Sequence, residues 1–438
     1  MRTKNMRRIG AMAAALLLSA AVTACSKAQD NSESAATVQP ASTQEAAATP
    51  ADSTATASEN ASSGTAAAAT GTSALDTTDM FSDRDLEQTA DLTDATSIAL
   101  TSGQDVALTE AGVYVLSGDA TDVTVVVEAA EDAKVQLVLD GVSITNEDAP
   151  AIYVKEADKV FVTTTDSENS LKVTGTYVAD GETNLDAVIF SRADVTLNGT
   201  GTLTVVSSEG NGISTKDDLK ITGGTYSIQS AEDALEANDS IRIKDGTLTI
   251  DAGKDGLHSE HDEDATLGYI YIAGGTMTIT AGDDGIQGNS VVQIDGGTID
   301  IPSSVEGIES TYIQINGGQI TVYASDDGIN ASQKVDSNVR IEVNGGTIDV
   351  TVGSGDTDGF DSNGDLYING GTITVQANSA FDADGTVQLN GGDVTVNGEK
   401  ITEIVQTGPG GGGGGGFGGG GGGRGQGGGQ GGGGMGRQ

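Results

Sequence analysis

Acidic residues recur at one position of a short repeated motif, and their type and spacing suit cation binding. The motif is Asp-Gly-apolar, and the position before its glycine or alanine holds Asp233, Asp255, Asp284, Glu306, Asp327 and Asp358. Further acids flank it at Asp283, Asp326 and Asp361. Close carboxylates repel one another unless a cation compensates them, and Ca²⁺ takes six to eight oxygen ligands. These nine acids are therefore the predicted Ca²⁺ ligands. The alternative is that Asp-Gly recurs only because a turn requires it.

A second recurring position carries side chains that suit sugar recognition. Its members face away from the apolar positions of the repeat, and those predicted to bind substrate are Lys220, Arg242, Tyr271, Gln293, Gln314 and Tyr367. Tyrosine rings present an apolar face and a polar tip, and amides and cations hydrogen-bond hydroxyl groups. The alternative is a solvated surface. Two residues further on, Asn316, Asn344, Asn369 and Asn390 are expected to form a structural ladder of stacked amides.

The residues that must position these side chains form a repeat of a little over twenty residues. Its core reads apolar-x-apolar-x-Gly-Gly-Thr-apolar-x-apolar, as in Ile313 to Val322. Alternation with period two indicates strands, and such short units bury their apolar sides only by stacking on neighbours. The sequence therefore predicts an all-β parallel solenoid over residues 92–407, with roughly 13–14 coils.

The two ends of the chain differ in composition from the repeat. Basic residues precede the apolar run Ile9–Val22, and the segment that ends at Cys25 resembles a bacterial lipobox. We predict a lipoprotein signal peptide over 1–24, acylation of Cys25, a disordered Ala/Ser/Thr-rich tether over 25–91 and a disordered Gly-rich tail over 408–438. These features predict an extracytoplasmic, cell-surface protein that a lipid holds to the cell membrane.

The charge balance restricts the class of partner. The chain holds 64 Asp and Glu against 21 Lys and Arg, a formal net charge of −43. Nucleic-acid binding requires basic residues that neutralise phosphates, so this balance argues against it and favours metal cations or neutral ligands. The single cysteine excludes an intrachain disulfide. His258 and His261 lie among carboxylates but match no zinc motif, and we expect a solvated loop there.

The lipobox, the tether, the Gly-Gly-Thr and Asp-Gly-Ile repeats and the Gly-rich tail together resemble a family of bacterial lipoproteins with a cellulose- and pectin-binding carbohydrate-binding domain. The resemblance implies a right-handed single-stranded parallel β-helix like that of pectate lyases. It also implies bound calcium and binding of cellulose or an acidic plant polysaccharide without catalysis. We expect the protein to be a monomer.

Two other functions remain open at this point. A polysaccharide lyase that acts on uronate polymers would need calcium and a base, and Arg242 and Lys244 are the candidates for that base. A surface adhesin or a structural rod would need neither property.

Overall fold

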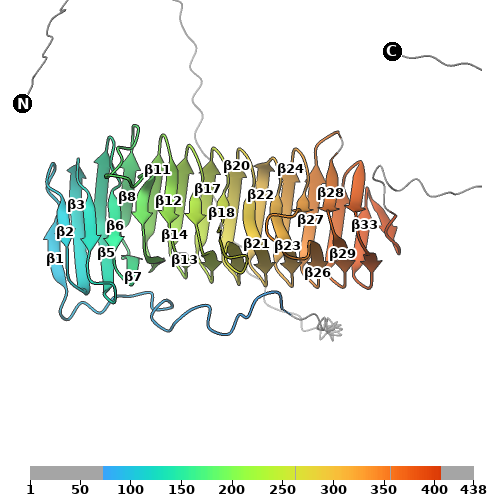
Figure 1. Cartoon of the computed structure of the whole chain (residues 1–438), viewed down its shortest axis with the longest axis horizontal. Helices are drawn as coiled ribbons and strands as arrows, with labels where there is room; N and C mark the ends of the chain where they lie inside the picture. The colour runs from blue at the N-terminus through green and yellow to red at the C-terminus, as the bar shows by residue number, and fades with distance from the viewer. Residues whose placement is uncertain (1–72, 262, 356, 406–438) are drawn as a thin grey trace, which may run out of the picture. The chain divides into compact units, whose positions relative to one another are not determined.

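The computed structural model describes residues 73–261, 263–355 and 357–405, and these residues form a parallel β-solenoid of about 12 turns (Figure 1). The described residues include strands and turns but no helix, so no helix in this part of the chain is long and apolar enough to cross a membrane. The predicted all-β solenoid is confirmed, with slightly fewer coils than the expected 13–14 because several turns carry extra residues. The predicted signal peptide, Cys25 and the Gly-rich tail lie outside the described residues.

Each turn contributes strands to three faces, and the strands of one face pair in parallel with those of the next turn. Face 1 carries the predicted sugar-binding ladder. Its strands are β1 (Thr96–Ala99), β3 (Gly112–Thr121), β5 (Lys134–Asn146), β7 (Lys159–Thr164), β10 (Asp194–Gly199), β13 (Asp218–Ile221), β16 (Ser240–Ile243), β19 (Tyr269–Ile272), β21 (Ile286–Ile294), β23 (Ile308–Ile315), β26 (Arg340–Val343), β29 (Asp365–Ile368) and β32 (Val387–Leu389).

Face 2 follows the Gly-Gly turn, and the second halves of β3 and β5 begin it. Its other strands are β8 (Glu168–Val173), β11 (Thr202–Ser207), β14 (Thr225–Ser230), β17 (Thr247–Ala252), β20 (Thr276–Ala281), β22 (Thr298–Ser304), β24 (Gln319–Ala324), β27 (Thr347–Val352), β30 (Thr372–Gln376) and β33 (Asp393–Val396). The last strand, β34 (Glu399–Ile401), pairs antiparallel with β33 and ends the ladder.

Face 3 follows the Asp-Gly motif and leads back to face 1. It uses the first halves of β21 and β23, which bend from one face to the other. Its other strands are β2 (Val106–Leu108), β4 (Val125–Glu128), β6 (Ile152–Glu156), β9 (Ala187–Ser191), β12 (Asn211–Thr215), β15 (Leu235–Ala237), β18 (Leu257–Ser259), β25 (Ile329–Ala331), β28 (Asp358–Ser362) and β31 (Ser379–Ala383).

The repeat folds in this way because its apolar residues fill a thin continuous core. Ile, Val and Leu from all three faces form one buried cluster along the solenoid. At the turn between faces 1 and 2 the second glycine has a positive φ, for example 96° at Gly297, which L-residues with a side chain rarely adopt. Beside this turn the predicted amide ladder is present: the side-chain amide of Asn344 donates to Asn316, and Asn369 donates to Asn344, both at 2.8 Å.

Residues 73–91, called the strap below, lie along face 1 and lead into β1. They fall within the segment predicted as a disordered tether, whereas here they make specific contacts with strands far away in sequence. In Figure 1 the strap is the blue segment that runs beside the strands to β1. The sequence does not reveal this packing because the strap has no apolar periodicity. It is attached by single polar groups and by one small apolar cluster around Met80.

Candidate metal centre and carbohydrate-binding surfaces

The acidic column at the start of face 3 has a structural role in several turns, with Asp233, Asp255, Asp284 and Asp327 as acceptors. One carboxylate oxygen accepts the backbone N–H of the equivalent acid in the next turn. Asp233 accepts from Asp255 at 3.0 Å and Asp255 accepts from Asp284 at 2.8 Å. One oxygen of these carboxylates thus binds the backbone of the next turn. The second oxygen of these carboxylates is directed to other partners.

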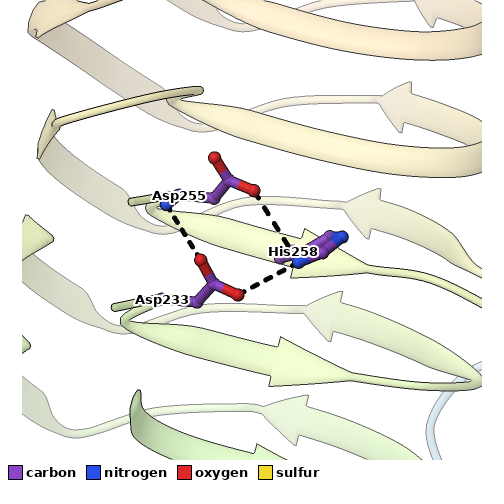
Figure 2. Close-up of side chains that lie close together, drawn as sticks. All are labelled: Asp233, Asp255 and His258. Atoms are coloured by element: carbon purple, nitrogen blue, oxygen red, sulfur yellow. Dashed lines mark hydrogen bonds and ion pairs between the residues drawn. The ribbon is translucent and has the colours of Figure 1, made fainter. Parts of the chain in front are cut away.

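Asp233, Asp255 and His258 form the first group that could hold a metal ion, here called the histidine cluster (Figure 2). Nδ1 of His258 lies 3.0 Å from Oδ2 of Asp233 and 3.7 Å from Oδ2 of Asp255. Burial alone would lower the pKa of His258, but its hydrogen bond to Asp233 and the surrounding acids raise it to about 8. Burial raises the pKa of Asp255 to about 6. The ring thus supplies a positive charge to this part of the column.

Asp284, Glu306 and Glu309 form the second group, here called the carboxylate cluster. Their ligand atoms lie within 4.8 Å of one another. Burial and then the neighbouring acids raise the pKa of Asp284 to about 7 and that of Glu306 to about 8. The only cation paired with the cluster among the described residues is Lys334, which contacts Glu309. Three carboxylates that share one lysine have an incomplete charge balance.

Asn330 adds a neutral oxygen beside the carboxylate cluster. Its Nδ2 donates to Glu306 at 2.9 Å. Its Oδ1 is buried and has no hydrogen-bond partner, and a buried unpaired acceptor is costly. Carboxylate and amide oxygens are the donors that Ca²⁺ prefers, so the donor set of Asp284, Glu306, Glu309 and Asn330 fits calcium better than the histidine cluster does.

The structure brings together only some of the predicted metal ligands. Asp233, Asp255, Asp284 and Glu306 join the two clusters, whereas Asp283 and Asp326 are exposed. Asp327 lies in the turn after Glu306, and Asp358 and Asp361 lie one turn beyond it, where burial and neighbouring acids raise the pKa of Asp361 to about 7. The sequence prediction omitted His258 and Glu309. The available signal was their position after the inward apolar residue, which places them on the same side as the acids.

The predicted sugar-binding ladder of face 1 is mostly covered by the strap. Oε1 of Gln293 accepts from the Ser73 hydroxyl at 3.0 Å and from the Leu75 amide at 2.9 Å. Oε1 of Gln314 accepts from the Ala74 amide at 2.8 Å. Tyr271 packs against Met80 and Phe81.

The basic members of the ladder are also engaged. Arg242 donates to the Met80 carbonyl at 3.4 Å and pairs with Asp218 at 2.7 Å. Lys220 is buried between Asp85 and Asp218. An arginine held in this way is a poor base, so Arg242 is better explained as structural, while Lys244 is exposed. Only Tyr367 lies beyond the strap contacts, with its ring 5.4 Å from the Arg340 guanidinium.

Face 2 presents a surface that the sequence analysis missed. Two outward positions repeat in register from β8 to β30 and are mostly hydroxyl residues. The first row is Glu168, Thr202, Thr225, Thr247, Thr276, Thr298, Gln319, Thr347 and Thr372, and the second is Ser170, Thr204, Ser227, Thr249, Thr278, Asp300, Thr321, Asp349 and Thr374. Strand spacing sets the rows in a grid with about 4.8 Å between neighbouring turns. We call this surface the hydroxyl face.

Two hollows lie on the hydroxyl face. A groove of about 530 Å³ at its N-terminal end is lined by hydroxyl, amide and carboxylate side chains, among them Ser143, Asn169 and Thr204. A second hollow of about 490 Å³ contains Tyr323, Gln376 and Asn378. Tyr323 is 47% exposed, which is unusual for a chain with so few aromatic residues. A ring beside amides is an arrangement that suits sugar binding.

Comparisons with known proteins show which family this chain is similar to. The model of the family "carbohydrate-binding domain-containing protein" matches residues 102–359 and 306–400. A protein of that description from Acetivibrio thermocellus is 37% identical over 144 residues, which is 32% of this chain and 49% of the relative. The chain therefore matches about half of that relative's length. A solved polysaccharide lyase-like protein from C. thermocellum, a gadolinium derivative, is 32% identical, with 51% of this chain and 92% of that chain covered at a TM-score of 0.45.

Proposed function

We propose, from the premise that the chain belongs to the carbohydrate-binding domain-containing protein family, that it binds polysaccharide without cleaving it and that calcium supports this binding. We place the protein outside the cytoplasm, at the cell surface, with Cys25 as the site of a lipid anchor. The segments that carry the last statement lie outside the described residues, so it depends on the lipobox-like sequence alone.

The observation that carries the proposal is the hydroxyl face with its exposed ring. Among the outward surfaces of the described strands it presents regular hydroxyl groups that the strap does not cover, and Tyr323 lies beside it. A polysaccharide chain offers hydroxyl groups at regular intervals together with apolar ring faces. The grid can exchange hydrogen bonds with the first, and the tyrosine ring can stack on the second.

Calcium enters as a structural support of the same solenoid. The carboxylate cluster lies at the start of face 3, where consecutive turns pack, and burial, followed by the neighbouring acids, raises the pKa of Asp284 and of Glu306. A bound Ca²⁺ would be held by Asp284, Glu306, Glu309 and Asn330 and would neutralise the charge of the carboxylates. This support would keep the turns of face 2 in register, because every turn contributes to all three faces.

Non-catalytic binding is favoured over a lyase by the surroundings of the basic residues. On face 1, the Arg242 guanidinium is committed to Asp218 and covered by the strap. On the hydroxyl face, no basic side chain lines either hollow among the described residues. A lyase with an arginine or lysine base would need that side chain within reach of the sugar, and neither hollow offers one among the residues that line it.

Retention of the full chain on insoluble cellulose and on pectin gel, with calcium present, tests the proposal. We expect Tyr323→Ala to weaken binding about tenfold, which corresponds to about 1.4 kcal/mol, and Tyr323→Phe to bind like the unmodified protein because the ring is kept. Val178→Ala removes an exposed side chain elsewhere and serves as the control. Absence of retention on every polysaccharide tested would contradict the proposal.

A further inference from the structure

The strap is fixed to face 1 at two buried points. Met80 packs between Tyr269 and Tyr271, and Asp85 is completely buried. The other strap residues are exposed or half-buried, and none of residues 73–91 forms a strand. Its other contacts are hydrogen bonds, such as those to Gln293 and Gln314, and two ring contacts, Phe81 with Tyr271 and Arg84 with Phe161. The strap thus occupies the surface of the solenoid without being part of its ladder.

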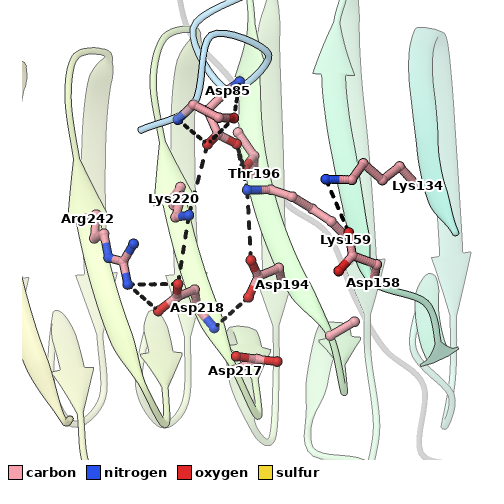
Figure 3. Close-up of polar contacts among 12 residues, drawn as sticks. Asp85, Lys134, Asp158, Lys159, Asp194, Thr196, Asp217, Asp218, Lys220 and Arg242 are labelled. Carbon is pink, nitrogen blue, oxygen red and sulfur yellow. Dashed lines mark hydrogen bonds and ion pairs between the residues drawn. The ribbon is translucent and has the colours of Figure 1, made fainter. Parts of the chain in front are cut away.

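Asp85 lies in a polar cage that face 1 supplies, formed by Lys159, Thr196 and Lys220 (Figure 3). Its Oδ1 is 2.6 Å from the Lys159 ammonium and accepts from the Thr196 hydroxyl at 2.7 Å. The Lys220 ammonium lies 3.9 Å from Oδ2. Ser82 of the strap itself donates to Oδ2 through its amide and its hydroxyl. The solenoid contributes two cations and a hydroxyl, all aimed at one carboxylate.

Two further acids, Asp194 and Asp218, lie near the lysines of the cage. Asp194 is 3.9 Å from Lys159, and Asp218 is 3.7 Å from Lys220 while it pairs more closely with Arg242. Without Asp85, Lys159 would keep only the distant Asp194. Lys220 would keep Asp218 at 3.7 Å. The largely buried Lys159 ammonium would lose its closest partner and would accept another carboxylate, because removal of one partner of a buried pair leaves an uncompensated charge.

We propose that the surface of face 1 under the strap is a second binding site, for a carboxylate-bearing sugar polymer, and that the strap is its built-in competitor, with Asp85 in the place of a ligand carboxylate. The inference rests on the proposed function, since that function identifies the ligand as a polysaccharide. It adds a cationic site on face 1 to the hydroxyl face on face 2.

The path of the strap indicates the shape of the ligand. From the cage, the strap crosses Arg242, then Tyr269 and Tyr271, then Gln293 and Gln314. The two glutamines accept hydrogen bonds from strap N–H and O–H groups, as they would from sugar hydroxyls. A chain that lay along this path would meet a cationic cage, aromatic side chains and amide acceptors in that order.

A ligand can bind this surface only if it displaces the strap, which belongs to the same chain. The strap is joined covalently to β1, so its effective concentration at face 1 is high. A ligand that makes a single contact therefore cannot displace it. A polymer that fills the cage and the amide positions together gains from several contacts. The site is therefore expected to respond to long acidic chains and to ignore single acidic sugars.

The test compares Asp85→Ala with the full unmodified chain by calorimetric titration with an oligogalacturonate and with an uncharged glucan oligomer. We expect Asp85→Ala to bind the oligogalacturonate at least tenfold more tightly than the unmodified chain, with unchanged affinity for the glucan. Adding Lys159→Met should remove this gain. Asp76→Ala changes an exposed strap acid that bonds only Thr78 and should behave like the unmodified chain.

Hydrogen exchange of the unmodified chain provides a second measurement, independent of how well the variant folds. Saturation with oligogalacturonate should increase amide exchange across residues 73–91. Unchanged exchange, or equal oligogalacturonate affinity in a folded Asp85→Ala, would overturn the inference. Retained glucan binding in that case would leave the proposed function intact, whereas loss of both ligands in every variant would contradict the proposed function itself.

Discussion

The strap residue Asp85 is buried next to Lys159 of face 1. At the start of face 3, in contrast, Asp284 and Glu306 are buried next to other carboxylates. Burial acts on all three groups in the same direction and favours the neutral acid. Hydrogen bonds from Lys159 and Thr196 nevertheless hold the pKa of Asp85 far below its usual range. At the start of face 3, called the corner below, the pKa values of Asp284 and Glu306 rise to about 7 and about 8. The difference lies in the partners: Asp85 lies between two lysines, whereas the three acids of the carboxylate cluster share Lys334 as their one paired cation among the described residues.

The largest expected effect is at the cage. Asp85→Ala should lower the free energy of unfolding by about 3–5 kcal/mol, because it leaves buried cations without their partner. Chemical denaturation followed by circular dichroism measures this change. The double variant Asp85→Ala with Lys159→Met removes the main unpaired charge and should recover part of the loss. A single variant as stable as the unmodified protein would show that the cage is not a tightly coupled ion pair.

Calcium should produce the next largest effect, and only at the corner. At a calcium concentration a hundredfold above Kd, binding to the native state adds about 2.7 kcal/mol. Glu306→Gln should abolish most of this stabilisation, whereas Asp283→Asn should preserve it because Asp283 is exposed beside the cluster. Melting temperatures with calcium and with chelator provide the measurement. Equal melting temperatures would exclude the cluster as a calcium site.

The pH dependence of the metal-free protein should be set by the corner. The folded-state pKa values of Asp255, Asp284 and Glu306 are about 6, 7 and 8, above their unfolded values, so the folded state binds more protons between about pH 4 and 8. Stability in chelator should therefore fall as pH rises from about 5 to 8. The raised pKa of His258, about 8, acts in the same direction, since its contribution is lost as pH rises past that value.

Bound calcium should flatten this pH profile, because the ion compensates the carboxylates when they ionise. Melting temperatures measured across the pH range with calcium and with chelator would show the contrast. A metal-free protein whose stability rises over the same range would contradict the assigned direction of the pKa shifts.

The smallest effect is expected at an exposed ion pair that resembles the cage only in composition. Lys134 and Asp158 lie 3.2 Å apart with half-exposed side chains. Exposed pairs contribute about 0–1 kcal/mol, so Lys134→Ala should change the free energy of unfolding by less than about 1 kcal/mol. A loss as large as that of Asp85→Ala would mean that burial is not what separates the two pairs.

The fold was predictable because it depends on local periodicity. Alternation in segments such as Ile313 to Ile315, and the positive φ that Gly297 requires, repeat in most turns and specify strands and turns without long-range information. Stacking in register follows, and with it the ladder from Asn316 to Asn390. The acidic column was visible for the same reason.

The sites were less predictable because they depend on contacts between distant residues. The attachment of Asp85 to Lys159 and Thr196 joins an aperiodic segment to two turns of the solenoid, and no local pattern encodes it. This contact removed most of the predicted sugar ladder from solvent. The threonines of the hydroxyl face were visible in the Gly-Gly-Thr motif, but the sequence analysis assigned them no role. Their recurrence at alternate positions, as at Thr247 and Thr249, was the signal that pointed to a second surface.

The central claim is that an intact solenoid, supported by calcium, presents the hydroxyl face to a polysaccharide. The most direct test is the retention of the full chain on insoluble polysaccharide, measured first with calcium and then after chelation. We predict retention with calcium, weaker retention in chelator, and about tenfold weaker binding for Tyr323→Ala than for Tyr323→Phe. Retention that is absent in both conditions, or that is indifferent to both chelation and Tyr323→Ala, would contradict the account.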